Sequence, residues 1–375
     1  MLRFRFLLVG TGLLCVTVGI GQSGQGTFSP GNIFLSELGL EGCRAERSWI
    51  REVDPATGES WLIADYFDGL CNNSGLAFTP DAARLRVINL TGNDIMDFDS
   101  NGVGAIVYDS SHGLGGPFGG NGLAWDREGN FFVANEYSQQ ILHFSPDAQQ
   151  PVVLADRNDG ITGGGGLAVL SNGDLLLAED RLFRITRAGI VSVFDPYFVR
   201  TYPVARTIAR SKNGTIYLGA RHVEGNSGTI YKYDHEDAST RQLVAEGFQI
   251  FNWMSIALSE DESVLYVVEQ WNLYSVDLDT YERRLLFTVP SDESQASVGR
   301  GIAVYKAPKP GDMNCDNWVN NFDIDPFVLA LTDEAGYQAR FGWCDRTRAD
   351  VNRDGTIDNF DIDAFVAAVI AHTDD

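Results

Sequence analysis

Apolar and polar residues alternate in short runs over most of the chain before residue 306, and turn-forming residues separate the runs. Segments 131–134 and 265–268 are continuously apolar, whereas 140–144 and 229–233 alternate. Alternation over such lengths is typical of strands with one buried face, and the Gly, Asn and Asp clusters between them predict turns. No helical periodicity of useful length precedes residue 320. The pattern therefore predicts twisted antiparallel sheets.

These strands belong to a repeat in which each unit begins with a segment similar to Gly-Leu-Ala. The aliphatic residue of this segment recurs with spacings of 47, 44, 41, 48 and 46 residues. The six aliphatic positions are Leu76, Leu123, Leu167, Ile208, Ile256 and Ile302. Periods of about 40–50 residues with several strands each indicate the blades of a β-propeller.

The number of repeats predicts how the propeller closes. Six initial strands are present, but only five are followed by a complete repeat, since the sixth (301–305) directly precedes the Pro-rich linker 307–310. The N-terminal region offers three further strand-like runs, at 33–36, 49–53 and 61–64. A blade built from both chain ends would remove the open sheet edges. We therefore expect an all-β, six-bladed propeller over 22–306, closed by its two ends.

The last part of the chain contains one short segment twice, at 312–331 and 350–369, with eleven of twenty positions identical. Each copy places oxygen-bearing side chains at positions 1, 3, 5, 9 and 12 of a loop. They are Asp312, Asn314, Asp316, Asn320 and Asp323 in the first copy, and Asp350, Asn352, Asp354, Asp358 and Asp361 in the second. Calcium prefers about six to eight oxygen ligands, and this spacing wraps the chain around one ion. The alternative is a pair of acidic turns that hold no ion.

Two further loop positions fit the same prediction. Position 7 would contribute a backbone carbonyl, from Trp318 and Thr356. Position 6 requires a sharp turn, which Gly355 makes freely and which Asn317 tolerates better than most residues.

The loop pattern, its duplication and the apolar helix after each loop resemble a dockerin type I module over residues 311–370. The resemblance implies a small EF-hand-like helical domain with two calcium ions, and a cohesin-like protein or cell-surface component as partner. In dockerins, loop positions 10 and 11 help to select that partner. Here they are Asn321 and Phe322, then Asn359 and Phe360. Because the two pairs are identical, the resemblance implies binding in two equivalent orientations.

Segment 121–144 resembles a blade of NHL-type and gluconolactonase-type six-bladed propellers, and the resemblance extends over most of 30–306. Gluconolactonase-type enzymes hold a divalent metal with Glu, Asn and Asp, the last two directly before initial strands. Asn121 matches the Asn position. The equivalent positions in the other blades are Ser74, Gly165, Arg206, Met254 and Arg300. The absence of Asp and the presence of two Arg count against that metal site.

Pairs of polar residues lie at or beside the end of the second strand of four blades, where they would face one mouth of the ring: Asn135 with Glu136, Glu179 with Asp180, Arg221 with His222, and Glu269 with Gln270. Glu136, Glu179, Glu269 and His222 are the candidates for general acid–base chemistry there. The alternative is that they satisfy turns and inter-blade hydrogen bonds.

Arg206 and Arg300, close to Asn121, predict a site for an acidic glycan or a small anion at the same mouth. Two guanidinium groups around one opening repel each other unless an anion or a carboxylate balances them. Glu179 or Glu269 could provide that balance internally.

The N-terminus indicates export. Arg3 and Arg5 precede an apolar stretch at 6–20, which is short and Gly-rich for a membrane span and fits a secretory signal peptide over 1–21. The alternative is an uncleaved anchor. We expect a secreted, extracellular or periplasmic protein.

The cysteines agree with an oxidising compartment. Without the signal segment the chain keeps four, and their positions suggest the pairs Cys43–Cys71 and Cys315–Cys344. The alternative is four free thiols.

The chain carries a net charge of −23, and residues 311–375 combine 14 acidic with 4 basic residues. Such a chain is repelled by phosphate backbones and anionic lipids, so nucleic acid and membrane partners are not expected.

Two functions follow from these features. The first is a secreted propeller that binds a glycan or protein, or acts as a scaffold, and is docked by the calcium module, with residues 371–375 as a short tail. The second is an extracellular lactonase-like or glycan-active hydrolase or lyase delivered by the same module. Dockerins most often accompany enzymes of polysaccharide catabolism, which supports the second function by association, whereas the missing metal set supports the first.

Overall fold

The computed structural model describes most of the chain between residues 5 and 371. The described residues are 5–9, 12–16, 27–38, 48–90, 92–112, 114, 122–146, 148, 150–198, 204–222, 227–249, 254–269, 271–289 and 298–371.

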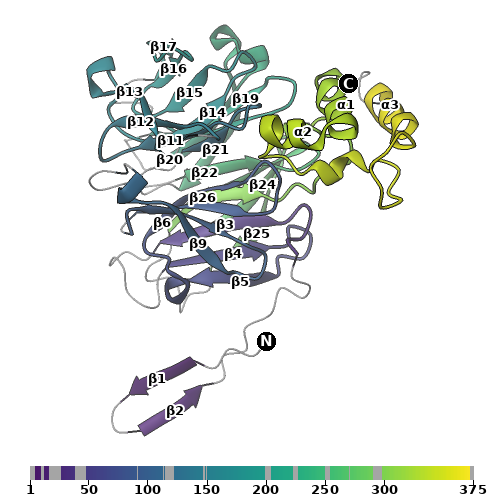
Figure 1. Cartoon of the computed structure of the whole chain (residues 1–375). Helices are drawn as coiled ribbons and strands as arrows, with labels where there is room; N and C mark the ends of the chain where they lie inside the picture. The colour runs from purple at the N-terminus through teal and green to yellow at the C-terminus, as the bar shows by residue number, and fades with distance from the viewer. Residues whose placement is uncertain are drawn as a thin grey trace.

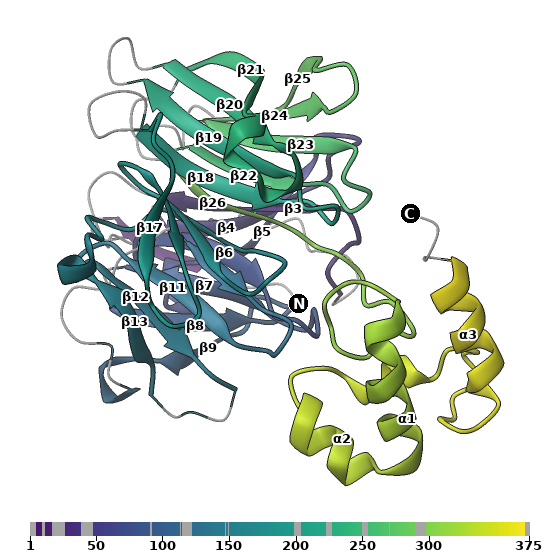
Figure 2. The ribbon, with the colours of Figure 1, turned by 90° about the horizontal axis from the view of Figure 1, so that it is seen from above.

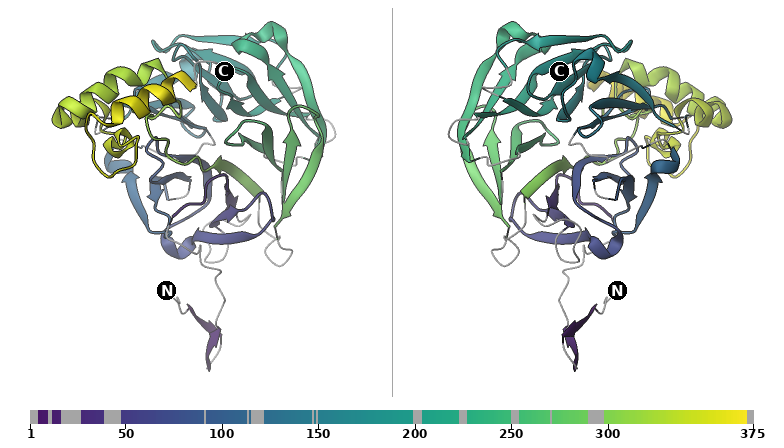
Figure 3. Two further views of the ribbon diagram at one scale, coloured as in Figure 1. Left: turned by 90° about the vertical axis from the view of Figure 1, so that its right-hand side faces the viewer. Right: turned by 90° about the vertical axis from the view of Figure 1, so that its left-hand side faces the viewer.

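Six four-stranded antiparallel sheets are arranged in a ring (Figures 1 and 3). Blade 1 contains β6 (Asn73–Phe78), β7 (Leu85–Asn89), β8 (Asp94–Phe98) and β9 (Gly104–Tyr108). Blade 2 contains β10 (Leu123–Trp125), β11 (Phe131–Asn135), β12 (Gln140–Phe144) and β13 (Val152–Asp156). Blade 3 contains β14 (Gly166–Val169), β15 (Leu175–Ala178), β16 (Leu182–Ile185) and β17 (Val191–Asp195). Blade 4 contains β18 (Val204–Arg210), β19 (Ile216–His222), β20 (Ser227–Tyr233) and β21 (Gln242–Gln249).

Blade 5 contains β22 (Met254–Leu258), β23 (Val264–Glu269), β24 (Asn272–Asp277) and β25 (Arg283–Thr288). Blade 6 joins the two ends of the ring. It contains β26 (Val298–Val304), β3 (Ile33–Leu38), β4 (Ser48–Val53) and β5 (Ser60–Asp65), in that order. The pairing of β26 with β3 is antiparallel and sets Ile302 opposite Leu35. The predicted six-bladed propeller and its closure are confirmed.

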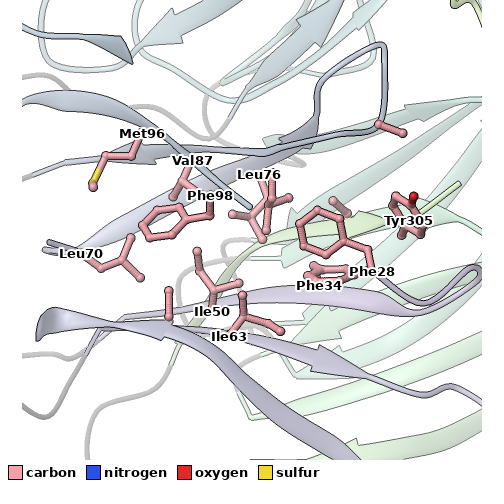
Figure 4. Packing of buried hydrophobic residues seen from close by; sticks show 14 residues of the cluster. Phe28, Phe34, Ile50, Ile63, Leu70, Leu76, Val87, Met96, Phe98 and Tyr305 are labelled. Atoms are coloured by element: carbon pink, nitrogen blue, oxygen red, sulfur yellow. The ribbon is translucent and has the colours of Figure 1, made fainter. Parts of the chain in front are cut away.

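Aromatic side chains fill the seam between blade 6 and blade 1 (Figure 4). The Phe34 ring lies 5.3 Å from Phe28 and 5.0 Å from Phe78, edge to face in both cases. Phe78 also lies 5.0 Å from Tyr305, which directly follows β26. Residues from the N-terminal end, the first complete blade and the C-terminal end of the ring therefore share one core.

The repeated aliphatic residues meet at the centre of the ring. The side chains that line the small central cavity include Leu76, Leu123, Leu167, Ile208, Ile256 and Ile302, one from each blade. A Cβ atom on Gly122 would collide with the backbone of blade 3, and one on Gly301 with the backbone of blade 1. The Gly-Leu-Ala pattern is thus explained by close packing of the innermost strands around the axis.

A helical region follows the ring and lies against one of its faces (Figure 2). It contains α1 (Ile324–Thr332), α2 (Glu334–Phe341) and α3 (Asp361–Ala371). Phe327 and Phe365 stack 3.9 Å apart between α1 and α3, and the buried Tyr337 of α2 donates a hydrogen bond to the Met313 carbonyl. The sequence predicted a helix after each loop but not α2, which lies in the connection between them.

Several shorter elements complete the described part of the chain. The 3₁₀ turns are Tyr66–Asp68, Ser110–His112, Arg157–Asp159, Asp234–Glu236, Ala238–Thr240, Asn321–Asp323 and Arg346–Ala349. The segment expected to be a signal peptide contains a hairpin of β1 (Arg5–Val9) and β2 (Gly12–Val16). Among the described residues, no helix has the length and apolar character needed to cross a membrane.

The seam predicts a large loss of stability when its central ring is removed. Phe34→Ala should lower the free energy of unfolding by roughly 3–5 kcal/mol, because it leaves a cavity among rings that cannot collapse inward. Phe67→Ala, at a side chain that is 65% exposed, is the control and should change it little. Urea unfolding of both variants would measure this, and equal stability would contradict the role of the seam.

Candidate functional site

The antiparallel pairing within each blade brings the beginning of the first strand and the end of the second strand to one mouth of the ring. Met254 faces Glu269 in blade 5, Gly166 faces Ala178 in blade 3, and Val204 faces Arg221 in blade 4. The predicted polar positions of several blades therefore share this mouth. Asn121, Gln270 and the side chain of Arg300 lie outside the described residues.

Arg206 is the centre of the charged groups at the mouth. Burial lowers the pKa of its guanidinium; the charges of Asp180 and Glu136 raise that pKa, and the charge of Arg221 lowers it. These groups come from blades 2, 3 and 4, so the structure brings the predicted Glu136 and Arg206 into one electrostatic neighbourhood. Asp180 and Arg221 complete it, although each was considered only as the neighbour of a candidate. The carboxylates whose charges raise the pKa of Arg206 include Asp180 and Glu136.

Glu179 accepts hydrogen bonds from the loop that precedes β14. One carboxylate oxygen accepts hydrogen bonds from the Thr162 backbone N–H at 2.9 Å and the Thr162 hydroxyl at 2.6 Å. The other accepts from the Gly163 N–H at 3.1 Å. Burial raises the pKa of Glu179, and these three hydrogen bonds oppose the change. The arrangement fixes the glycine-rich loop that leads into β14 of blade 3.

His222 and Glu269 are also engaged with their own blades. His222 Nε2 lies 2.7 Å from the Thr229 hydroxyl, and burial lowers the pKa of His222 while the charge of Glu246 raises it. Glu269 is buried and contributes, after burial itself, to raising the pKa of Tyr274. Both contacts support the interpretation that these side chains stabilise strand ends.

The two predicted calcium loops have the same hydrogen-bond framework. In the first, Asp312 accepts from the Asp316 and Asn317 N–H groups, and Asp323 accepts from the Asn314 and Asn320 N–H groups. In the second, Asp350 accepts from Asp354 and Gly355, and Asp361 accepts from Asn352 and Asp358, at equivalent positions. The repeated sequence thus produces a repeated loop geometry.

The backbone of the loops turns where the sequence predicted. Asn317 and Gly355, at position 6, have φ of 70° and 87°. Cys315 and Arg353, at position 4, are also left-handed, with φ of 57° and 62°. Two left-handed residues per loop curve the chain around a centre toward which its oxygen-bearing side chains can turn.

The carboxylates of the first loop are more deeply buried than most of those of the second. Burial raises the pKa of Asp312 to about 7, even though the adjacent Arg348 guanidinium lowers it. Burial likewise raises the pKa of Asp323 to about 6 and raises that of Asp316. In the second loop Asp361 is buried, whereas Asp354 is exposed.

The donor set of each loop fits a hard cation, since carboxylate, amide and carbonyl oxygens are available at the required positions. In the first loop the charges of Asp316 and Asp323 also raise the pKa of Asp312. Within the described ranges, no three His, Cys, Asp or Glu side chains are close enough to hold a metal ion. The carboxylates bond instead to the amides of their own loops.

The predicted partner-binding positions lie on the surface. Phe322 is 60% exposed and Phe360 is 73% exposed. They begin equivalent apolar stripes, which continue through Ile324 and Val328 on α1 and through Ile362 and Val366 on α3.

A disulfide joins Cys315 to Cys344, as the sequence predicted. Cys71 is also disulfide-bonded, whereas Cys43, its expected partner, lies outside the described residues.

The helical region contacts the ring at the turns between first and second strands, on the face opposite the mouth (Figures 2 and 3). Arg348 Nη2 donates to the Pro80 carbonyl of blade 1 at 3.1 Å, and Arg127 Nε of blade 2 lies 3.3 Å from Asp316 Oδ2. The Trp343 indole covers Gly129, where a Cβ would overlap it. Sequence patterns did not indicate these contacts, because they join residues more than 180 positions apart.

Comparisons with solved structures find proteins that share little sequence with this chain. A gluconolactonase candidate has a TM-score of 0.46 at 11% identity, over 61% of this chain and 80% of the other. A calcium-binding protein, regucalcin from Agrobacterium tumefaciens, has a TM-score of 0.35 at 18% identity, over 44% and 57%. Hydrazine synthase from Kuenenia stuttgartiensis has a TM-score of 0.40 at 12% identity, over 56% and 64%.

This chain thus spans less than two thirds of the hydrazine synthase and regucalcin structures. At these identities the likeness concerns the fold alone. No protein-family model and no curated protein matches the chain.

The raised pKa values predict an unusual pH dependence for the helical region without divalent ions. Because folding raises the pKa of Asp312 and Asp323, their contribution to stability is complete below about pH 4 and is lost as the pH rises through about 6–7. Hydrogen exchange at α1 in a chelator should therefore accelerate from pH 4 to 7, after correction for intrinsic exchange. Asp323→Asn should flatten the pH dependence of exchange, whereas Asp325→Asn, at an exposed position, should preserve it. An exchange rate of the wild type that does not change with pH after this correction would contradict the prediction.

Proposed function

We propose that this chain is a secreted glycan-recognition propeller carried by a calcium-dependent, dockerin-like docking module. The observation that carries the proposal is the position of the module. It lies on the turn face of the ring and leaves the charged mouth uncovered, so the two surfaces can bind different partners at the same time.

The mouth has the chemistry needed for an acidic oligosaccharide. The guanidinium groups of Arg206 and Arg221 can donate to a sugar carboxylate or sulfate, and Glu136 and Asp180 can accept from sugar hydroxyls. Asp180 and Glu136 already act on Arg206, so the ligand anion would share Arg206 with them. Arg300 and Asn121, expected at the same mouth, would extend this set.

The docking module would hold calcium in each loop. The ligands would be the side chains at positions 1, 3, 5, 9 and 12 and the carbonyls of Trp318 and Thr356. The shared framework of the two loops, the left-handed turns and the buried carboxylates support this. Phe322 with Asn321 and Phe360 with Asn359 would contact a cohesin-like protein or cell-surface component.

Calcium removal should unfold the module selectively. The module has a small apolar core, so bound ions should contribute much of its folding free energy, about 4 kcal/mol per site at a thousandfold excess over Kd. Chelation should release exchange protection over 311–370 and leave the propeller protected. Asp361→Asn should reduce the calcium stoichiometry from two to one and the exposed Asp363→Asn should not. An unchanged exchange pattern on chelation would rule out this role of calcium.

A binding screen tests recognition at the mouth. Wild-type protein should bind acidic oligosaccharides more tightly than neutral ones, and Arg206→Ala should weaken acidic binding about 10- to 100-fold, the range expected when a hydrogen bond to a charged group is lost. Arg84→Ala removes a charge from the opposite face and should leave binding unchanged. Equal binding of acidic ligands by wild type and Arg206→Ala would refute the proposed site.

An extracellular lactonase-like or glycan-active hydrolase is the second candidate. It is favoured by the convergence of Glu136 and Asp180, from neighbouring blades, on Arg206. Hydrolysis of a lactone or glycoside that disappears in Glu136→Gln, while ligand binding persists, would establish this function instead.

A further inference from the structure

The two calcium loops have the same framework but different neighbours. The first contacts the propeller, whereas in the described part of the chain no Lys, Arg or His forms an ion pair with a carboxylate of the second. A sequence repeat alone gives no reason for this difference, since the ligand positions of the copies are nearly identical.

Arg348 connects the first loop to blade 1. Its Nη1 lies 2.6 Å from Asp312 Oδ2, and both side chains are almost fully buried. Its Nη2 donates to the Pro80 carbonyl at 3.1 Å. One guanidinium therefore joins the position 1 carboxylate to the turn of the propeller.

Arg127 connects the same loop to blade 2. Its Nε lies 3.3 Å from Asp316 Oδ2, the oxygen that also accepts from Asn314 Nδ2 at 3.3 Å. Asp316 Oδ1 accepts from the Trp318 N–H instead. Asp316 is at position 5 of the loop, so Arg127 is paired with a carboxylate that a cation would also need. The Arg127 guanidinium also lies 5.6 Å from the centre of the Phe322 ring.

We propose that the first loop is a cation site whose affinity is set by the propeller. Arg127 and Arg348 act as resident cations that compete with calcium, so ion binding at this loop and docking of the module on blades 1 and 2 oppose each other. The second loop binds calcium independently of the ring. This inference rests on the calcium binding proposed above.

The local charges determine the direction of the effect. Three carboxylates and two guanidinium groups leave the first loop with one net negative charge, whereas the second has four carboxylates and no paired guanidinium among the described residues. A divalent ion is therefore attracted more weakly to the first loop, and its charge repels both Arg side chains. Linkage requires the reciprocal effect, so calcium at the first loop must weaken the propeller contact.

Calorimetric titration of the full chain with calcium chloride separates the two sites. The wild type should show one tight and one weak calcium site. Arg127→Gln should increase the calcium affinity of the weak site about tenfold, which is a typical coupling between two sites. Arg84→Gln is a matched control, because the Arg84 side chain is 47% exposed compared with 45% for Arg127, and it pairs with Asp99 rather than with a loop. The control should leave both sites unchanged.

Hydrogen exchange provides the second measurement. Filling of the weak site should accelerate exchange at the blade 2 turn, residues 126–130, and leave the mouth strands unchanged. The coupling would be overturned if Arg127→Gln left the calcium affinities of both sites unchanged, or if calcium slowed exchange at this turn. Either result would leave calcium binding itself intact. No uptake at either loop would instead contradict the proposed function on which the coupling depends.

Discussion

The pairing of β26 with β3 is the interaction on which the remaining structure depends. It completes the sixth sheet and so closes the ring. The closed ring determines which strand ends meet at the mouth. The pairing also determines where the chain leaves the ring. The Tyr305 N–H donates a hydrogen bond to the Asn32 carbonyl at 3.0 Å, at the face that carries the turns between first and second strands. Residues 307–310 therefore leave the ring on the side opposite the mouth. The location of the helical region follows from this exit.

The sequence predicted the elements that local periodicity determines. The six aliphatic positions from Leu76 to Ile302 identified the axis of the ring, and the incomplete sixth repeat identified its closure, because both are consequences of regular strand spacing. The left-handed turn at Asn317 was equally predictable, because few residue types tolerate it. The partners of Arg206 and the roles of Glu179 and Glu269 were not predictable in this way, because strand register places a residue at a mouth but does not determine which side chains face it.

The helical region shows the same limit more clearly. Its repeated loop sequence predicted two equivalent sites, and the hydrogen-bond frameworks are equivalent. The surroundings are not equivalent, because the first loop is paired with Arg127 of blade 2 and is joined through Arg348 to Pro80 of blade 1. Arg127 and Pro80 come from sequence regions with no similarity to the loops. A duplicated segment within an asymmetric protein experiences two electrostatic environments, so equivalent loop positions have different charged neighbours.

The opposite placement of the mouth and the module also affects how the two parts can influence each other. Arg127 and Pro80 lie in turns that follow the first strands of blades 1 and 2, and these strands begin at the mouth. A change at the turns could reach the mouth only by moving a strand along its length. The aromatic seam around Phe34 resists such movement, because a close-packed core has no space into which a strand can slide. The ring thus acts as a rigid spacer between the mouth and the helical region, so the proposed calcium effect at the first loop is expected to leave the mouth unchanged.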